Sequence, residues 1–327
     1  MKIKKIALLF VFLNLICQPI IYSQKYNAID SVVLKYPNFG SIDKLAKRIQ
    51  KDFTSEHDKA RAIYSWIALN LNYDLKAYLN PPREKSYSFK NEDDWAKKLE
   101  SIDEKTIQKA FKSRKAVCEG FSLLYAHLGS LVGLKCQVIN GDSKTQLSDI
   151  GRKRLKTSHA WNTVLIDGKW ALVDVTWGQG YYDLDRLFMV KDFSSIYFDQ
   201  NPKFFYAKHF PNEWMNSENI EKEKTFLNAP LIYKAFIKVD CEIITPNSGV
   251  IQANDGDEII FKIKNISKFE NFYYLDIKGN HVEIVNPKEE NGLFEFKITY
   301  NKNLGKFINF YLFNEGLVTF KIIPRTI

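Results

Sequence analysis

The chain has 327 residues, of which 45% are hydrophobic, 26% are charged and 14% are aromatic. This composition excludes an intrinsically disordered protein, and the length allows one large core or two ordinary ones, so we expect two globular domains. The formal net charge is +9, but basic and acidic residues are interleaved along the chain and do not form a cluster. A nucleic-acid-binding protein is therefore not expected.

The N-terminus has the pattern of a secretory signal peptide. Lysines precede an apolar run over residues 6–16, and the small Ser23 follows it. We therefore expect residues 1–23 to be a cleaved signal peptide and the protein to be exported, either periplasmic or secreted. A membrane span needs roughly 20 apolar residues, so we expect no integral span in the mature form. A lipid anchor at Cys17 is a weaker alternative, because no small residue directly precedes it.

Helical periodicity dominates the next part of the chain. Over residues 41–70, apolar side chains recur at three- and four-residue steps on one face. Residues 80–94 contain prolines and many charges, which predicts a loop, and a short helix is expected over residues 101–112. A buried amphipathic helix is predicted to begin at or just after Cys118 and to end at Gly133.

After this helix the hydrophobic period changes to two. Alternation predicts strands over residues 136–140, 160–166 and 170–175. Asp167 and Gly168, between the last two segments, both tolerate positive φ and therefore predict a tight hairpin. One helix followed by an antiparallel sheet indicates an α+β domain.

The C-terminal part has a different pattern. Residues 188–227 are aromatic and irregular, and we expect them to wrap the first domain. From residue 235 onward, turns of Pro, Asn and Gly separate short β-rich segments, which predicts a small all-β sandwich. We place the first domain at residues 24–225 and the sandwich at residues 235–327. The expected strands cover residues 242–244, 258–263, 272–277, 281–285, 293–298, 307–313 and 318–323.

The cysteines point to a nucleophile. Cys118, Cys136 and Cys241 remain after cleavage of the expected signal peptide, and this odd number leaves at least one thiol outside any intramolecular disulfide. A cysteine at the start of a helix lies beside unpaired N–H groups and the positive end of the helix dipole, which favour a thiolate over a thiol. The alternative is a structural Cys118 that is buried or bonded to Cys136.

Two candidate partners for Cys118 flank the predicted hairpin. His159 and Asp174 lie at the ends of its two strands, so a hydrogen bond between them is expected. The carboxylate would fix the imidazole tautomer and stabilise its charged form, which gives a candidate Cys-His-Asp triad. A metal site of the same three residues is a poorer alternative, because they lack the paired ligands of a zinc site.

Together these motifs resemble the transglutaminase-like superfamily, over roughly residues 60–180. The resemblance implies a papain-like α+β core, in which a thiol attacks an amide carbonyl and water or an amine resolves the thioester. It implies no metal or organic cofactor. The motifs are residues 66–74, Cys118-Glu119-Gly120, His159-Ala160-Trp161-Asn162 and Asp174-Val175-Thr176-Trp177.

A later segment refines the resemblance. His209-Phe210-Pro211 and Trp214 are similar to the branch of the superfamily that contains kyphoscoliosis peptidase and yeast cytokinesis-protein relatives. The family order implies that Cys118 is the nucleophile, His159 the base and Asp174 the residue that orients the base. The residues expected to line the site around them are Trp161, Asn162, Trp177 and Glu119.

The oxyanion-stabilising groups are less well defined by the sequence. By analogy with the family, one donor is the backbone N–H of Cys118. Trp66, Trp95 and Lys112 precede the nucleophile and are candidates for the second donor, although Trp66 also fits a core position on its helix.

Three functions remain open. The first is an exported hydrolase of peptide or isopeptide amide bonds in protein or peptide substrates, which we favour. The second is amine transfer that cross-links proteins through the same triad. The third is a non-catalytic module that binds the cell envelope and keeps the family fold.

Overall fold

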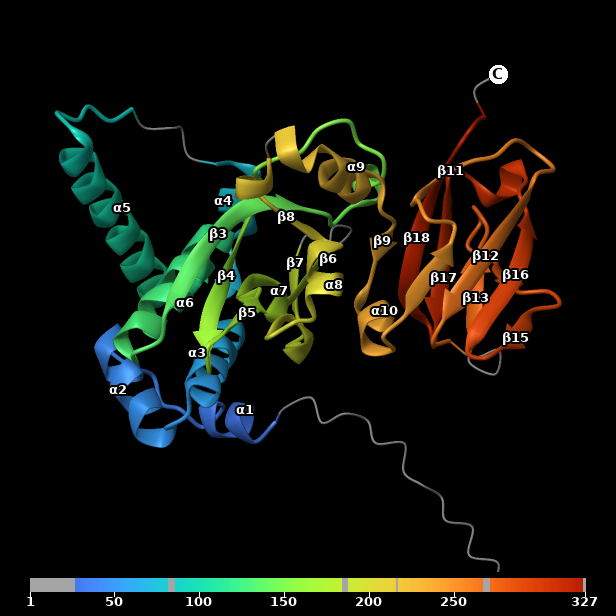
Figure 1. Cartoon of the computed structure of the whole chain (residues 1–327). Helices are drawn as coiled ribbons and strands as arrows, with labels where there is room; N and C mark the ends of the chain where they lie inside the picture. The colour runs from blue at the N-terminus through green and yellow to red at the C-terminus, as the bar shows by residue number, and fades with distance from the viewer. Residues whose placement is uncertain (1–26, 82–85, 184–187, 216, 267–270, 326–327) are drawn as a thin grey trace, which may run out of the picture.

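The computed structural model describes residues 27–81, 86–183, 188–215, 217–266 and 271–325. The expected signal peptide, residues 1–23, lies outside the described residues. Figure 1 shows helices packed on a small sheet in the first two thirds of the chain and two β-sheets at its C-terminal end. Among the described residues, no helix has both the length and the apolar character needed to cross a membrane.

The segment predicted to be helical over residues 41–70 divides into two helices, α2 (Ile42–Asp52) and α3 (Glu56–Asn70). The break arises because the Ser55 hydroxyl accepts a hydrogen bond from the Asp58 N–H at 3.0 Å and so caps a new helix. The short helix α1 (Ala28–Val33) packs against α3. The apolar residues that the periodicity assigned to one face of residues 41–70 are buried in the core of this domain.

Helix α5 (Glu92–Ser113) is longer than the short helix predicted over residues 101–112. Its N-terminal turn is rich in acidic residues, which suggested a loop but are favourable at the positive end of a helix dipole. Asn91 caps it by accepting a hydrogen bond from the Asp94 N–H at 2.9 Å. Two small elements precede it, β1 (Asn72–Tyr73) and α4 (Leu75–Leu79).

The central sheet is antiparallel and has the strand order β5-β4-β3-β8. Helix α6 (Cys118–Leu131) packs against β3 and β4. The predicted hairpin joins β4 to β5, and both turn residues, Asp167 and Gly168, have positive φ values of 48° and 79°. The strands are β3 (Cys136–Ser143), β4 (His159–Ile166), β5 (Lys169–Val173) and β8 (His209–Pro211).

Residues 188–227 contain more regular structure than the sequence indicated. Strand β8 is the most consequential element, because it pairs with β3 and brings His209 to the edge of the central sheet. The buried Lys144 ammonium donates to the carbonyls of Leu227 and Ala229 at 3.3 and 2.7 Å, which ties the end of α9 to the first domain. The elements are β7 (Phe188–Lys191), which pairs with β6 (Gly180–Asp183), η2 (Ser195–Tyr197), α8 (Pro202–Tyr206), η3 (Asn212–Trp214), η4 (Ser217–Asn219) and α9 (Ile220–Asn228).

The C-terminal part is a β-sandwich, as predicted. One sheet has the order β10-β12-β16-β15 and the other β11-β18-β17-β13-β14, with β9 also paired to β18. Aromatic side chains fill the space between them; the rings of Phe261 on β12 and Phe310 on β17 are 5.0 Å apart. The strands are β9 (Leu231–Ile232), β10 (Glu242–Thr245), β11 (Val250–Gln252), β12 (Glu258–Lys264), β13 (Phe272–Leu275), β14 (His281–Glu283), β15 (Lys288–Glu290), β16 (Leu293–Thr299), β17 (Phe307–Leu312) and β18 (Glu315–Ile323).

The fold class is therefore α+β followed by an all-β sandwich. The first domain and the sandwich each have their own cluster of buried apolar residues. The limits 24–225 and 235–327 remain predictions, and β9, which pairs with β18, precedes residue 235. The short helix α10 (Lys234–Lys238) leads from β9 into the sandwich.

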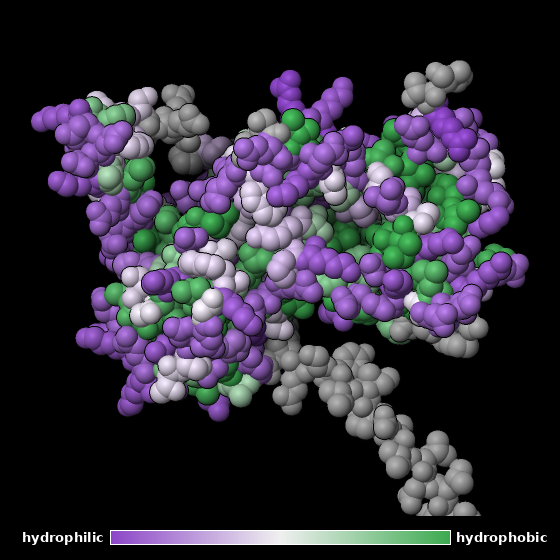
Figure 2. Space-filling model, in the orientation of Figure 1, coloured by the Kyte–Doolittle hydropathy of each residue, from purple (hydrophilic) through white to green (hydrophobic). Residues whose placement is uncertain are grey.

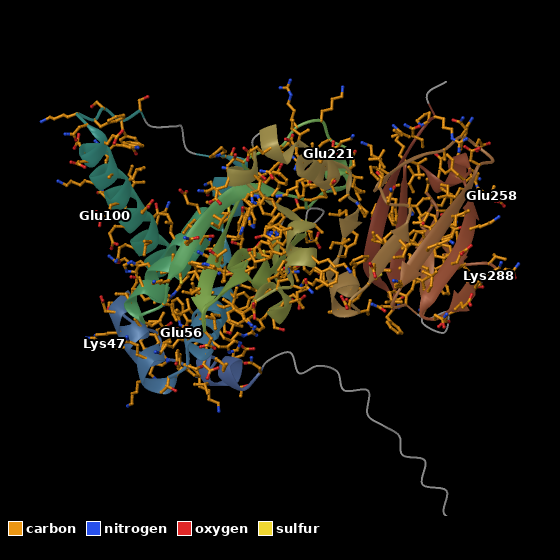
Figure 3. The ribbon with its side chains drawn as sticks, in the orientation of Figure 1. Lys47, Glu56, Glu100, Glu221, Glu258 and Lys288 are labelled. Carbon is orange, nitrogen blue, oxygen red and sulfur yellow. The ribbon has the colours of Figure 1, made fainter. Side chains whose placement is uncertain are left out.

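Charged side chains of both signs cover the outside of both parts. Figure 2 shows hydrophilic residues over most of the visible face. In Figure 3, Lys47, Glu56 and Glu100 project from the helices of the first domain, and Glu258 and Lys288 project from the sandwich. Buried polar and titratable groups therefore stand out against this charged surface.

Candidate active site

Cys118 is the first residue of α6, as the sequence predicted. The chain reaches it from α5 through Arg114, whose left-handed φ of 56° ends that helix, and through β2 (Lys115–Ala116). No side chain caps the start of α6, so its N–H groups stay available beside the thiol. Close packing at Gly120, where an added Cβ would lie 2.7 Å from the Ala116 Cβ, holds this turn against β2. The thiol itself is half-buried.

His159 and Asp174 meet at the open end of the hairpin, as the sequence predicted. His159 begins β4, and Asp174 follows β5 and caps the short helix α7 (Val175–Gly178). The imidazole Nε2 lies 2.7 Å from the Asp174 Oδ2, while the Asp174 Oδ1 accepts the N–H of Trp177 at 3.0 Å. Both side chains are buried, which strengthens this hydrogen bond.

A second histidine shares the same carboxylate oxygen. The Nε2 of His209 lies 3.0 Å from the Asp174 Oδ2, and its Nδ1 lies 3.0 Å from the backbone carbonyl of Phe205. The His209 ring stacks on the Phe205 ring with a centroid distance of 3.9 Å. The sequence marked His209 only as part of a family motif, because its role depends on the pairing of β8 with β3.

The electrostatics of this cluster favour a charged His159. Burial lowers the pKa of His159, but the charge of Asp174, its hydrogen bond and a hydrogen bond with the Cys118 side chain outweigh burial and raise the pKa to about 10. Burial raises the pKa of Asp174, yet the two histidines hold it well below its usual range. Burial lowers the pKa of His209, against the opposing effect of Asp174. Asp174 is therefore a buried carboxylate that stabilises one imidazolium.

His209 holds Asp174 in position. A neutral imidazole has a single N–H and can donate to only one of the two oxygens near it, and the carboxylate is the stronger acceptor. The Asp174 carboxylate thus receives donors from His159, His209 and the α7 backbone. This arrangement fixes the orientation of the carboxylate before any substrate arrives.

Replacement of His209 tests this positioning role. His209→Phe should slow alkylation of Cys118 at pH 6 by about tenfold, because a buried carboxylate that loses one donor is left about 1–3 kcal/mol less stable and no longer fixes His159. His209→Gln keeps an N–H donor and should recover most of the rate. Equal rates in His209→Phe and the wild type, measured by peptide mapping with matched unfolding curves, would contradict the role.

The four residues expected to line the site lie in different places. Trp177 stacks on the His159 ring, with centroids 5.3 Å apart. Trp161 is buried, and its ring packs edge-to-face on the His209 ring with a centroid distance of 4.9 Å. The amide of Asn162 donates to the carbonyls of Ser122 and Gln137, so it joins α6 to the sheet. Glu119 is exposed on the first turn of α6.

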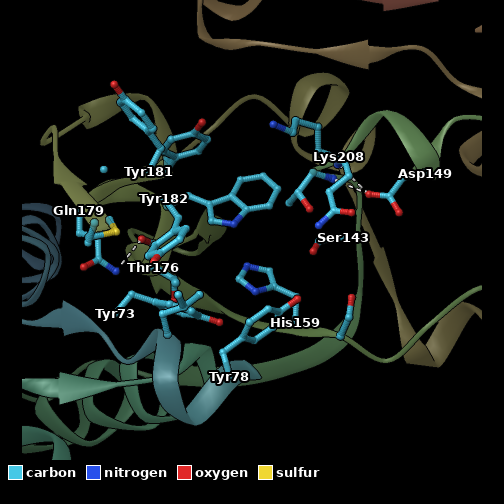
Figure 4. Close-up of a pocket in the computed structure, with 18 of the residues that line it drawn as sticks. Tyr73, Tyr78, Ser143, Asp149, His159, Thr176, Gln179, Tyr181, Tyr182 and Lys208 are labelled. Atoms are coloured by element: carbon cyan, nitrogen blue, oxygen red, sulfur yellow. Dashed lines mark hydrogen bonds between the residues drawn. The ribbon is translucent and has the colours of Figure 1, made fainter. Parts of the chain in front are cut away.

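A cavity of about 390 Å³ opens beside His159 (Figure 4). Its wall is mainly aromatic and polar, and Trp177 and His159 form part of it. Cys118, Asp174, Trp161, Asn162 and Glu119 are not among the described residues that line it. Tyrosines dominate the rest of the wall: Tyr73, Tyr78, Tyr181, Tyr182, Tyr197 and Tyr233.

The candidate oxyanion donors other than the Cys118 N–H lie away from this cavity. Trp66 is buried and stacks on Phe111 at 5.5 Å, as a core residue does. Trp95 contacts Phe89 near the start of α5, and Lys112 is exposed. Tyr73 is in a better position: its strand pairs with β2, directly before the nucleophile, and it lines the cavity. Burial, and next the Cys118 charge, raises the pKa of Tyr73.

The other thiols differ from Cys118 in their surroundings. Cys118, Cys136 and Cys241 are all free, so the alternative of a Cys118–Cys136 disulfide does not hold in this structure. Burial raises the pKa of Cys136 and of Cys241 to about 12. Within the described residues, Cys118 is thus the cysteine that contacts a titratable partner of the site.

One group of potential metal ligands occurs among the described residues, and it is not the Cys-His-Asp set weighed from the sequence. It consists of His159, Asp174 and His209, whose ligand atoms lie within 4.8 Å of one another. The Asp174 Oδ2 lies 2.7 Å from the Nε2 of His159 and 3.0 Å from the Nε2 of His209, and these are ordinary hydrogen-bond distances. The carboxylate of Asp174 is therefore already paired with its two histidine partners.

Comparison with known proteins agrees with this geometry. Residues 43–175, which contain Cys118, His159 and Asp174, match the model of the Transglutaminase-like superfamily. These residues of the chain are therefore similar to a transglutaminase-like domain. The structure thus bears out the family resemblance and the α+β fold class that the motifs predicted.

The transglutaminase-like part also has curated relatives. The chain is 26% identical to the kyphoscoliosis peptidase of Homo sapiens over 58% of this chain and 26% of that protein. It is 28% identical to the Lim and transglutaminase domain protein ltd-1 of Caenorhabditis elegans over 47% of this chain and 19% of that protein. A solved TGase structure aligns at 19% identity and a TM-score of 0.28, over 49% of this chain and 35% of that one. The chain thus matches about a quarter or less of the length of these curated relatives.

Proposed function

We propose that this chain is an exported cysteine hydrolase that cleaves peptide or isopeptide amide bonds with Cys118, His159 and Asp174. The observation that carries the proposal is the hydrogen bond between the buried carboxylate of Asp174 and the imidazole of His159, which lines the cavity, together with a half-buried thiol at the start of the helix that packs on the same sheet. Similarity to the transglutaminase-like superfamily supports the same chemistry. Export is supported only by the sequence pattern of residues 1–23.

In the proposed reaction, the Cys118 thiolate attacks the carbonyl carbon of the amide and the carbonyl oxygen becomes negative. The first N–H groups of α6 can donate to this oxyanion, with Tyr73 in the cavity wall as a candidate further donor. His159 then gives its proton to the departing amine nitrogen, the C–N bond breaks, and a thioester remains. Water, deprotonated by His159, attacks the thioester; the C–S bond breaks and a carboxylate leaves.

Amine transfer is the competing function, because an amine in place of that water yields a new amide through the same thioester. Neither the triad nor its hydrogen bonds distinguishes the two outcomes. We favour hydrolysis because polar groups line the cavity beside His159, and Tyr78 and Tyr181 in its wall are exposed to solvent, which would favour the entry of water. A non-catalytic envelope-binding module would have no need of a paired buried carboxylate and imidazole.

The two reactions differ in the mass of their products. The mature protein should be incubated with a pool of short peptides in 18O-labelled water, with and without a small primary amine, and the products read by mass spectrometry. Hydrolysis predicts new carboxylates that carry 18O in both mixtures, and Cys118→Ala should form none. Products that carry the added amine would instead assign transfer. A wild type that forms neither kind of product would support the binding module.

A further inference from the structure

A lysine ammonium lies in the wall of the cavity, next to the candidate catalytic histidine. Lys208 comes directly before β8, and its Nζ lies 4.5 Å from the centre of the Trp177 ring, which in turn stacks on His159. Figure 4 shows Lys208 and His159 pointing into the same cavity. The Trp177 ring therefore links the lysine to the site at which the amide would react.

The backbone holds this lysine in place. The N–H of Lys208 donates to the Phe205 carbonyl at 3.0 Å, and its own carbonyl accepts the N–H of Lys144 at 2.9 Å. The next residue, His209, is anchored on Asp174. A side chain that starts from such a fixed backbone loses less entropy when it binds a ligand, so Lys208 is preorganised.

Among the residues that the structure describes, none forms an ion pair or a hydrogen bond with the Lys208 Nζ, which lies over the Trp177 ring. Burial and the charge of Lys234 lower its pKa to about 8, while Asp174 has the opposite effect. Asp174 is already engaged by two histidines and cannot serve as its partner. Bringing a carboxylate to this ammonium would restore the interactions that it loses by leaving water.

The rest of the cavity also favours an anion. Lys156 and Lys234 line it too, and Lys234 reaches Asp192 at 2.8 Å on the outer side. Among the described residues of the wall, the acidic one is Asp149, which accepts the N–H groups of Thr145 and Gln146 at 2.9 and 2.8 Å. Its charge is therefore taken up by the backbone, and the described part of the wall has an excess of positive charge.

On the basis of the proposed function, we infer that Lys208 binds a carboxylate of the substrate next to the scissile amide. The substrate class is then an acidic acyl donor, whose carboxylate comes either from an Asp or Glu side chain or from a chain terminus. The tyrosines around the cavity would pack against the neighbouring peptide, since their rings are apolar and their hydroxyls polar. Lysine acts as a point charge here, so it accepts a carboxylate from several directions.

Two alkylating reagents of nearly equal size test the charge effect without a known substrate. Iodoacetate carries a carboxylate and iodoacetamide does not, and both transfer their carbon to the Cys118 sulfur with loss of iodide. At pH 6, Lys208→Met should lower the rate with iodoacetate about fivefold and leave the rate with iodoacetamide within about twofold, because one charge near the site attracts only the anion. Lys208→Arg should keep the wild-type ratio.

The matched control is Lys203→Met on the neighbouring helix α8, whose side chain is exposed and does not line the cavity. It should leave both rates unchanged. An unchanged ratio in Lys208→Met, with rapid labelling of Cys118, would reject the anion site and leave the proposed function intact. If wild-type Cys118 labels no faster than Cys241 with either reagent, the proposed nucleophile itself fails.

Peptide pools separate the two sources of the carboxylate. One pool is amidated and lacks Asp and Glu, the second is amidated and contains Glu, and the third lacks Asp and Glu but has a free C-terminus. Faster wild-type turnover of the second pool assigns an acidic side chain, and faster turnover of the third assigns a terminus. Either preference should fall in Lys208→Met and not in Lys203→Met. Equal turnover of all three pools would overturn the substrate class.

Discussion

Iodoacetamide at about pH 6 should label Cys118 roughly a hundredfold faster than Cys136 or Cys241. A thiolate paired with an imidazolium reacts at a pH at which ordinary thiols, with pKa values near 8.5, are less than about 1% ionised. The charge of Asp174 keeps His159 protonated, since it helps to raise the pKa of His159 to about 10. Burial raises the pKa of the other two thiols to about 12, which slows their reaction further.

His159→Ala should abolish this low-pH reactivity. The variant removes the cationic partner, so Cys118 should react only at alkaline pH, with the profile of an unpaired thiol. The matched control is His127→Ala on α6, since that histidine lies on the same helix but outside the cavity. The measurement is labelling across pH followed by peptide mapping of the non-reduced protein. Low-pH labelling that persists in His159→Ala would remove His159 from the site.

Asp174→Asn should lower the rate of peptide hydrolysis, measured as incorporation of 18O, by about 10³- to 10⁴-fold and leave the fold intact. The amide has the size of the carboxylate and can still cap α7, but it carries no charge and can present an N–H to His159, which favours the wrong tautomer. Full activity of this variant would exclude Asp174 from the triad. A suitable control is Asp167→Asn in the hairpin turn, because Asn also tolerates its positive φ of 48°.

The same variant should change the pH dependence of stability. Because the folded-state pKa of His159 is raised to about 10, the folded protein keeps a proton that the unfolded chain loses near pH 6.5. This stabilisation is complete below about pH 6.5 and is lost as the pH rises through about 10; it amounts to a few kcal/mol at most. Denaturant unfolding at pH 6 and pH 10 should show the loss in the wild type and a smaller loss in Asp174→Asn.

Local sequence patterns were sufficient to predict the scaffold of the site. The apolar spacing after Cys118 predicted α6, and Asp167 and Gly168 predicted the hairpin that brings His159 and Asp174 together. These features are encoded over short distances, because helical periodicity and turn residues act within a few positions of one another. The limits of α3 and α5 were less accurate, since their caps depend on single side chains such as those of Ser55 and Asn91.

The remaining features of the site depend on contacts between distant segments. His209 reaches Asp174 across 35 residues only because β8 pairs with β3, and nothing in its own segment signals that edge strand. Tyr73 comes beside Cys118 through the pairing of β1 with β2, while the tryptophans considered from the sequence pack elsewhere. The motifs by themselves thus determined the candidate nucleophile, base and carboxylate. Only tertiary packing decided their supporting groups and the charge of the cavity, because burial and counter-ions are properties of the assembled fold.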